Sequence, residues 1–152
     1  MRTLTVVALA LLVGAGACPN TTSTPPTPPP EVGRLIAVTR AGSVDVEIDS
    51  SLAPLAVAAT VKVQGARVAG AAQAGSAAAD RDLFKQKAFN EEDMRFAISD
   101  SRALRIQRSG VLVSIPVDGT PTNVEVTDIT AASEDGSEVI LKGFNGAPEA
   151  RQ

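Results

Sequence analysis

The segment SVDVEID, residues 43–49, is the clearest alternation of apolar and polar side chains in the chain. In an extended strand its valines and isoleucine fall on one side and its three carboxylates on the other. This pattern predicts a β-strand with one buried and one solvent-facing side. Residues 33–40 precede it and are separated from it by the turn signal Ala41-Gly42, so the two segments are expected to form a β-hairpin.

Similar patterns recur on the C-terminal side of this hairpin. Further strands are expected at 55–64, 94–98, 103–108, 111–117, 122–130 and 138–144. Segments 103–108 and 111–117 flank Ser109-Gly110 and are expected to form a hairpin, as are 122–130 and 138–144 around 134–137.

The connections between these strands are predicted from composition. Residues 70–79 are rich in alanine and glycine and are expected to be a loop, and 118–121 are expected to be a turn. Residues 80–89 have roughly helical spacing, so a short helix and a strand both remain open for 80–99, with strand favoured.

Seven or eight short strands separated by turn signals predict a mainly β fold. A small antiparallel β-sandwich, immunoglobulin-like as first choice, is expected, with a partly open barrel or a two-layer α+β domain as alternatives. The β-rich domain is expected to span 33–146, with a disordered tail at 147–152. The four phenylalanines are expected in a core of otherwise small side chains: Phe84, Phe89, Phe96 and Phe144.

The composition excludes several classes of function. The 152 residues include no histidine, tryptophan or tyrosine and only one cysteine, so Ser-His-Asp and Cys-His catalysis are excluded. No cofactor or metal site is expected, and the chain is predicted not to be an enzyme. The formal net charge of −3 argues against nucleic acid as a partner.

The N-terminal segment is typical of an export signal. Arg2 precedes the apolar run 4–17, which ends in the small residues Ala15-Gly16-Ala17. The run is 14 residues long, whereas a membrane-spanning helix needs about 20. Residues 1–17 are therefore predicted to be a signal peptide that is removed.

The segment 13–18, VGAGAC, resembles the lipobox of bacterial lipoproteins. The resemblance implies cleavage between Ala17 and Cys18 and attachment of lipid, with fatty acyl chains such as palmitate, to the Cys18 sulfur. It places the mature protein on the cell membrane or outer membrane, exported and lipid-anchored. Ala15-Gly16-Ala17 also fits an ordinary secretory cleavage site, which would release a soluble protein instead.

A linker is expected between the anchor and the domain. Residues 18–32 begin with the cysteine and are then rich in proline and threonine. Such a segment has almost no apolar side chains to bury, so it is predicted to be disordered but stiff.

Three groups of charged residues are candidate sites. Asp45, Glu47 and Asp49 on one strand face suggest half of a calcium site, against a simple solvated face, which is preferred. A second group, considered as paired glycosidase carboxylates, consists of Asp80, Asp82, Glu91, Glu92 and Asp93. A third, considered as a surface for an acidic partner or as protection of an edge strand, consists of Arg95, Arg102, Arg105 and Arg108.

The sequence therefore predicts a cell-envelope lipoprotein that displays a small non-catalytic β-domain with a structural, accessory or protein-binding role. Its expected partners are the membrane, through the lipid anchor at Cys18, and an envelope protein, but not nucleic acid. The alternatives are a secreted soluble binding protein and a hydrolase that uses carboxylates alone on envelope glycan.

Overall fold

The computed structural model describes residues 31–81, 83–88 and 90–145, which form eight β-strands and one short 3-10 helix. In chain order these are β1 (Glu31–Arg40), β2 (Ser43–Ser50), β3 (Ala56–Val68), β4 (Gln73–Ala74), η1 (Ser76–Ala78), β5 (Leu83–Ala88), β6 (Asp93–Ser99), β7 (Ser109–Ala132) and β8 (Ile140–Asn145). The predicted signal peptide, the linker up to residue 30 and the tail 147–152 lie outside the described residues. No helix in the described part is long and apolar enough to cross a membrane.

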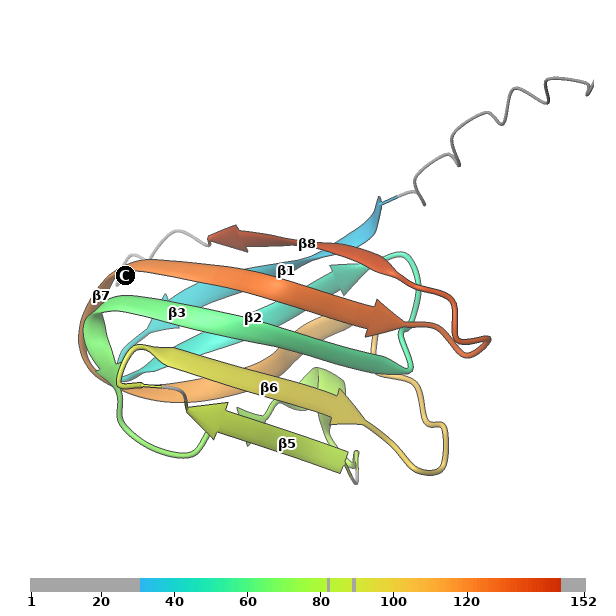
Figure 1. The fold of residues 1–152 in the computed structure, drawn as a ribbon, viewed down its shortest axis with the longest axis horizontal. Helices are drawn as coiled ribbons and strands as arrows, with labels where there is room; N and C mark the ends of the chain where they lie inside the picture. The colour runs from blue at the N-terminus through green and yellow to red at the C-terminus, as the bar shows by residue number, and fades with distance from the viewer. Residues whose placement is uncertain (1–30, 82, 89, 146–152) are drawn as a thin grey trace, which may run out of the picture.

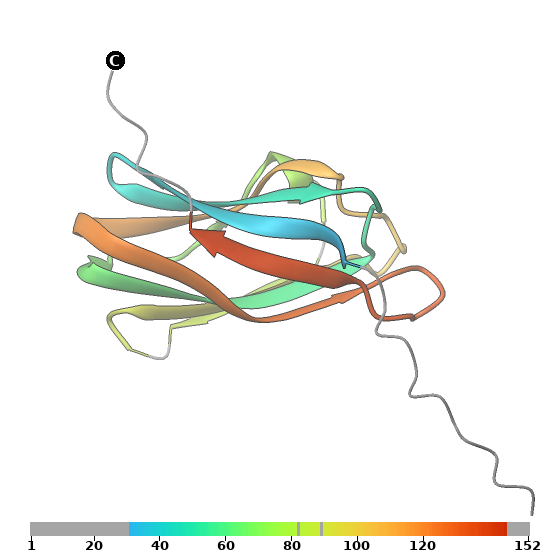
Figure 2. The same cartoon turned by 90° about the horizontal axis from the view of Figure 1, so that it is seen from above.

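The strands pack as two layers, which are seen from the front in Figure 1 and from above in Figure 2. One sheet has the order β8-β1-β2-β7-β4 and the other has the order β5-β6-β3-β7. Strand β7 belongs to both sheets, so hydrogen-bonded pairing connects all eight strands, with β4 as a branch from β7. The mainly β sandwich expected from the sequence is confirmed.

Strand β7 crosses from one sheet to the other in its middle. Residues 109–116 pair with β2, whereas residues 117–132 pair with β3. Gly119, at φ 98°, lies just after the crossing, where a β-carbon would be strained. The turn predicted at 118–121 is therefore wrong: these residues continue an extended strand that bends between the layers.

Both hairpins predicted in the C-terminal half are also wrong. Residues 103–108 form no strand; Ile106 is buried, but Leu104 is 41% exposed. The backbone N–H of Ile106 donates to the carbonyl of Pro54 at 2.7 Å, so this segment is tied to the loop after β2 rather than to β7.

Strand β8 pairs with β1, not with β7, and the pairing is parallel. The turn at 133–137 forms as expected and is closed by an antiparallel bridge between Ala132 and Glu138, but the chain then crosses to the edge of the other sheet. Phe144 thereby lies beside Ile36 on the outer surface and is 43% exposed, so its predicted core position is wrong. Phe96 is fully buried, as expected. The side chains of Phe84 and Phe89 lie outside the described part of the chain.

The segment between β3 and β6 is more ordered than predicted. Strand β5 pairs with β6, so the helix considered for 80–89 is excluded. Within the expected loop 70–79, β4 and η1 form, and Ala77 and Ala78 are fully buried. The side-chain amide of Gln86 accepts from the N–H of Ala72 at 2.5 Å and donates to its carbonyl at 2.9 Å. This pair of bonds ties β5, at the edge of one sheet, to the segment before β4, at the edge of the other.

The core lies between the two sheets and consists mainly of valine, alanine and isoleucine. The alternation predicted in β2 and β3 is confirmed, because the apolar side of each strand is buried. The largest fully buried side chains include Phe96, Leu35, Ile48, Ile98, Ile106, Leu112 and Ile115.

Candidate functional site

The outer surface of the β5-β6-β3-β7 sheet is the strongest candidate for a functional site. Its outward side chains at the centre are small, with Ala58 and Thr60 on β3, Ala97 on β6 and Thr127 on β7. We call this surface the β6-β3-β7 face and define it by Ala58, Thr60, Lys62, Arg95, Ala97, Glu125, Thr127, Asp128 and Thr130. Small side chains on neighbouring strands leave a flat surface that a folded partner can approach closely.

The cations of this face are not neutralised within the described part of the protein. Lys62 lies between Asp93 of β6 and Glu125 of β7 in the register, yet no ion pair joins it to a described carboxylate. Arg95, opposite Thr60, is likewise without an ion pair among the described residues. Unpaired charges around a flat centre can select a partner of complementary charge.

The outer surface of the other sheet is different, because strand-to-strand ion pairs cover it. Arg34 of β1 lies 2.8 Å from Asp49 of β2. Arg40 reaches both Asp45, at 2.6 Å, and Glu47, at 3.0 Å. The carboxylates considered as half of a calcium site are therefore held by arginines of β1. Within the described residues no cluster of potential metal ligands is present.

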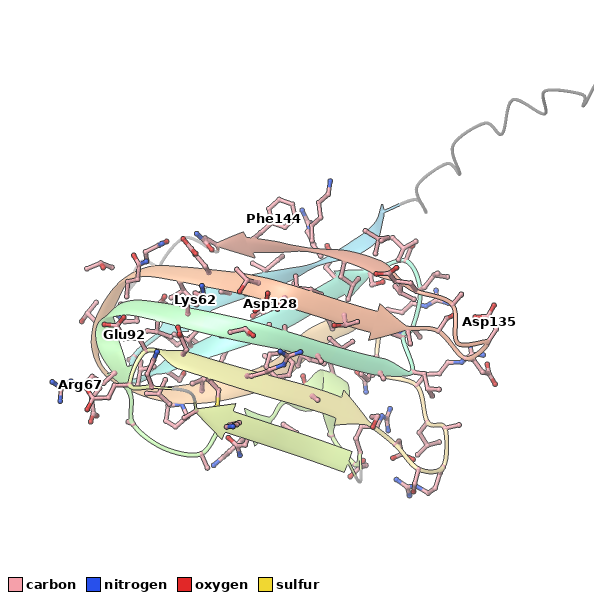
Figure 3. All side chains as sticks on the ribbon, viewed as in Figure 1. Lys62, Arg67, Glu92, Asp128, Asp135 and Phe144 are labelled. Atoms are coloured by element: carbon pink, nitrogen blue, oxygen red, sulfur yellow. The ribbon has the colours of Figure 1, made fainter. Side chains whose placement is uncertain are left out.

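A β-bulge places a carboxylate on the β6-β3-β7 face. The register between β3 and β7 shifts between Ala58 and Thr60, and opposite this shift Asp128 has a φ of 49°. A residue other than glycine in this left-handed region is strained, and bulges commonly re-aim a side chain at a functional site. Figure 3 shows Asp128 and Lys62 on the same side of the sheet, on the neighbouring strands β7 and β3.

One polar group of this face has no hydrogen-bond partner in the described structure. The hydroxyl oxygen of Thr127 is shielded from solvent and makes no hydrogen bond to the described residues. An unsatisfied buried hydroxyl is costly, at about 1–3 kcal/mol. The bulge and this hydroxyl are adjacent in β7, so the two unfavourable features occur at one place on the face.

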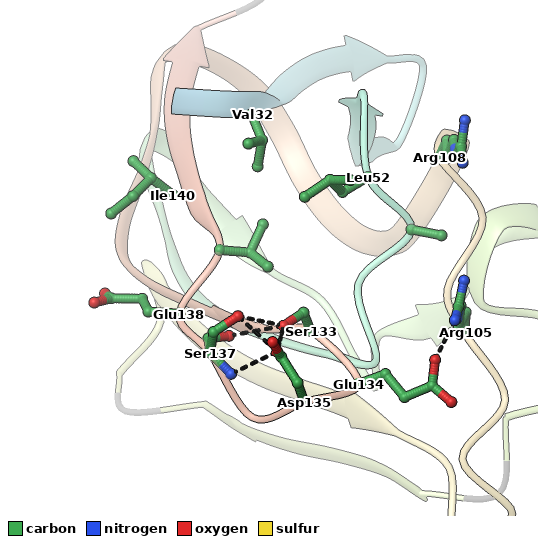
Figure 4. Close-up of a pocket in the computed structure, with 12 residues that line it drawn as sticks. Val32, Leu52, Arg105, Arg108, Ser133, Glu134, Asp135, Ser137, Glu138 and Ile140 are labelled. Atoms are coloured by element: carbon green, nitrogen blue, oxygen red, sulfur yellow. Dashed lines mark hydrogen bonds and ion pairs between the residues drawn. The ribbon is translucent and has the colours of Figure 1, made fainter. Parts of the chain in front are cut away.

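A cavity of about 500 Å³ lies at the end of the sandwich where β1 begins. Its lining combines apolar residues, two arginines and the turn between β7 and β8 (Figure 4). In that turn, Asp135 accepts hydrogen bonds from the hydroxyl of Ser133 and from the hydroxyl and backbone N–H of Ser137. These bonds stabilise the ionised carboxylate and lower the pKa of Asp135 from 3.8 to about 2.

The stability that the ionised Asp135 carboxylate gives to this turn is expected to be lost at low pH. Because the pKa of Asp135 is depressed on folding, its stabilising effect is complete well above pH 3.8 and is lost as the pH falls through about 2. A carboxyl-carbon NMR titration should give a midpoint near 2, and Ser133→Ala should raise it toward 3.8. Ser43→Ala, at the opposite end of β2 from the cavity, should leave it unchanged, and a wild-type midpoint at 3.8 would contradict the assignment.

The other predicted residues are not brought together into one site. Asp80 precedes β5, whereas Glu91 follows it and pairs with Arg67 at 3.2 Å. Six residues of strand separate them by roughly 20 Å, too far for two carboxylates to act on one glycosidic bond. Asp82 lies outside the described residues, as do Ala17 and Cys18.

The predicted arginine cluster is also divided. Arg95 lies on β6 within the β6-β3-β7 face, and Arg102 pairs with the buried Asp100 at 2.8 Å. Arg105 pairs with Glu134 at the cavity, which Arg108 also lines. Because 103–108 is not a strand, the expected role of these arginines in protecting an edge strand is wrong for Arg105 and Arg108.

The sequence matches no protein-family model, and no curated protein sequence matches it. Solved structures do share its fold. A non-cellulosomal cohesin from the hyperthermophilic archaeon Archaeoglobus fulgidus has a TM-score of 0.61 at 16% identity, over 78% of this chain and 94% of the cohesin. The fold is similar to that of cohesin domains.

Two structures of cohesin–dockerin complexes match with the same TM-score. The sixth cohesin of scaffoldin B from Acetivibrio cellulolyticus, in complex with a Cel5 dockerin, has a TM-score of 0.61 at 14% identity, over 76% of this chain and 99% of that one. A type I cohesin–dockerin complex from Clostridium thermocellum also has a TM-score of 0.61, at 10% identity, over 75% of this chain and 90% of the matched chain. The immunoglobulin-like sandwich expected from the sequence is confirmed by these likenesses.

Proposed function

We propose that this protein is a lipid-anchored envelope protein whose β-sandwich binds a protein partner, without catalysis, through the β6-β3-β7 face. The observation that carries the proposal is the difference between the two outer surfaces. One is covered by ion pairs between its own strands, whereas the other is flat and keeps Lys62 and Arg95 without ion pairs in the described structure.

The fold supports a folded protein as partner. Two of the similar structures are cohesins in complexes with dockerins, so a sandwich of this kind serves in those proteins as one half of a protein complex. A flat sheet surface offers area rather than depth, which suits a folded domain better than a small molecule. Lys62, Arg95, Glu125 and Asp128 would set orientation and specificity around the small residues at the centre.

The anchor is argued from the N-terminal sequence. Cys18 follows an apolar signal and precedes 12 residues, 19–30, that are rich in proline and threonine; β1 begins at Glu31, so it includes the last two residues of the linker expected from the sequence. Proline-rich chain extends by about 3.1 Å per residue, so the linker would hold the sandwich up to about 40 Å from the membrane. Each acyl methylene buried in the bilayer contributes about 0.8 kcal/mol, so several chains on one cysteine would make attachment persistent.

Cys18→Ser is expected to abolish membrane attachment. The wild-type protein should partition into detergent and carry the mass of the lipid on an N-terminal Cys18, whereas the variant should remain in the aqueous phase. Thr21→Ser is the matched control and should partition as wild type. An unmodified thiol at the mature N-terminus of the wild-type protein would contradict the anchor and support the secreted alternative.

Site-specific photo-cross-linking tests the proposed binding surface. A photoreactive residue at Ala97, in the centre of the β6-β3-β7 face, should cross-link one defined envelope protein in intact cells. The same residue at Gln73, exposed on the other sheet, should not cross-link that protein. Equal cross-linking from both positions, or cross-linking from Gln73 alone, would contradict the proposal.

A further inference from the structure

The cavity at the end of the sandwich has an apolar wall and is separate from the β6-β3-β7 face. The wall consists of Val32 of β1, Leu52 of the loop after β2, Val139 just before β8 and Ile140 at its start (Figure 4). Its volume of about 500 Å³ is within the range of about 300–1,000 Å³ typical of small-molecule sites. Leu52 is 46% exposed, so a large apolar side chain of the wall is left in contact with water.

The acidic residues on one side of the cavity are largely engaged. Glu134 accepts from the guanidinium of Arg105. Asp135 is bonded by Ser133 and Ser137 of its own turn. Neither carboxylate is therefore free to neutralise a second cation in the cavity. Glu138, the third carboxylate of the lining, lies on the far side of the cavity and points away from Arg108 (Figure 4).

Arg108 is the second cation, and no ion pair joins it to a carboxylate of the described residues. It lines the same cavity as Leu52 (Figure 4). A guanidinium binds a carboxylate through paired, charge-assisted hydrogen bonds. The cavity thus presents an anion-binding group next to an apolar wall.

We propose that this cavity binds an aliphatic carboxylate. The carboxylate contacts the guanidinium of Arg108, and the hydrocarbon chain covers Leu52 and extends along Val32 and Ile140. Covering Leu52 removes apolar surface from water, and the charge on Arg108 selects an acid over a neutral compound of the same shape. This site is independent of the protein partner proposed above.

The test uses octanoate and its neutral analogue octanamide with the full mature chain carrying Cys18→Ser, so that no lipid competes. Methyl NMR follows the side chains that form the wall: Val32, Leu52, Val139 and Ile140. Octanoate should shift these methyl signals in a saturable manner, and octanamide should bind about 10-fold to 100-fold more weakly. Arg108→Gln should weaken octanoate binding by a similar factor. Arg67→Gln, at the other end of the sandwich, should not weaken it.

Three results would overturn the proposal. These are equal affinity for octanoate and octanamide, unchanged octanoate binding in Arg108→Gln, and shifts only with a short peptide that ends in a free leucine carboxylate. The last result would assign the cavity to a protein C-terminus instead.

Discussion

Replacement of Gly143 by alanine is expected to lower the free energy of unfolding by about 3 kcal/mol. A β-carbon at this position would lie 2.1 Å from the carbonyl oxygen of Val126. Gly143 is on β8, the edge strand of one sheet, and Val126 is on the half of β7 at the edge of the other. The glycine thus permits the two sheet edges to approach each other closely.

The clash cannot be relieved by rotation of a side chain, because the nearest atom belongs to the backbone. That backbone is fixed, since Val126 pairs with Val61 of β3 and Gly143 pairs with Leu35 of β1. One of the strands must move away, which exposes core side chains. Urea denaturation of Gly143→Ala against wild type measures the effect.

Gly70→Ala is the matched control. A β-carbon there would meet only Pro116 Cγ at 3.6 Å, an ordinary contact, and Gly70 is outside the left-handed region. Its free energy of unfolding should therefore stay within about 0.5 kcal/mol of wild type. If Gly143→Ala is as stable as Gly70→Ala, the close approach of β8 and β7 described above does not exist in solution.

The strands predicted best from the sequence are those that show apolar–polar alternation within the strand itself. In β2 each apolar residue is followed by a polar one, and the same holds in β3 from Ala59 to Gln64; burial of one side of a strand is sufficient to produce that pattern. The Ala41-Gly42 turn was also predictable, because Gly42 at φ 78° supplies the conformation that the turn requires.

The predictions that were wrong depend on pairing between distant strands. Asp118-Gly119 has the composition of a turn, but Gly119 lies where a 24-residue strand passes between sheets. The polar turn at 133–137 predicted a hairpin, but the strand after it pairs in parallel with β1, about a hundred residues earlier in the chain. No local pattern distinguishes these outcomes, because each depends on which distant strand the segment pairs with.

The candidate site was only partly visible in the sequence. Alternation places Thr60, Lys62 and Gln64 on the outward side of β3. Lys62 and Gln64 are exposed, which confirms the prediction for them, whereas Thr60 is only 6% exposed. It does not show that Arg95 and Thr127 lie on either side of Thr60, because that requires β6, β3 and β7 to be neighbours. The bulge at Asp128 also depends on the shifted register with β3, so it had no signal in the sequence.

Ala97→Arg is expected to lower the affinity for the partner by about 100-fold or more without loss of stability. Ala97 is an exposed residue of β6, between Ala58 of β3 and Lys85 of β5, so a longer side chain meets no core atoms. A long charged side chain at the centre of a flat interface keeps the two surfaces apart and excludes contacts around it. A 100-fold loss corresponds to about 2.7 kcal/mol, which is typical of a disrupted central contact.

The measurement is the dissociation constant for the protein captured by cross-linking from position 97, together with thermal unfolding of each variant. Gln73→Arg is the matched control, because it adds the same side chain to an exposed position on the other sheet. It should bind as wild type. If both variants bind as wild type, the partner does not use the β6-β3-β7 face. If Gln73→Arg alone loses affinity, the interface is on the ion-paired sheet, and the unpaired cations Lys62 and Arg95 do not mark the binding surface.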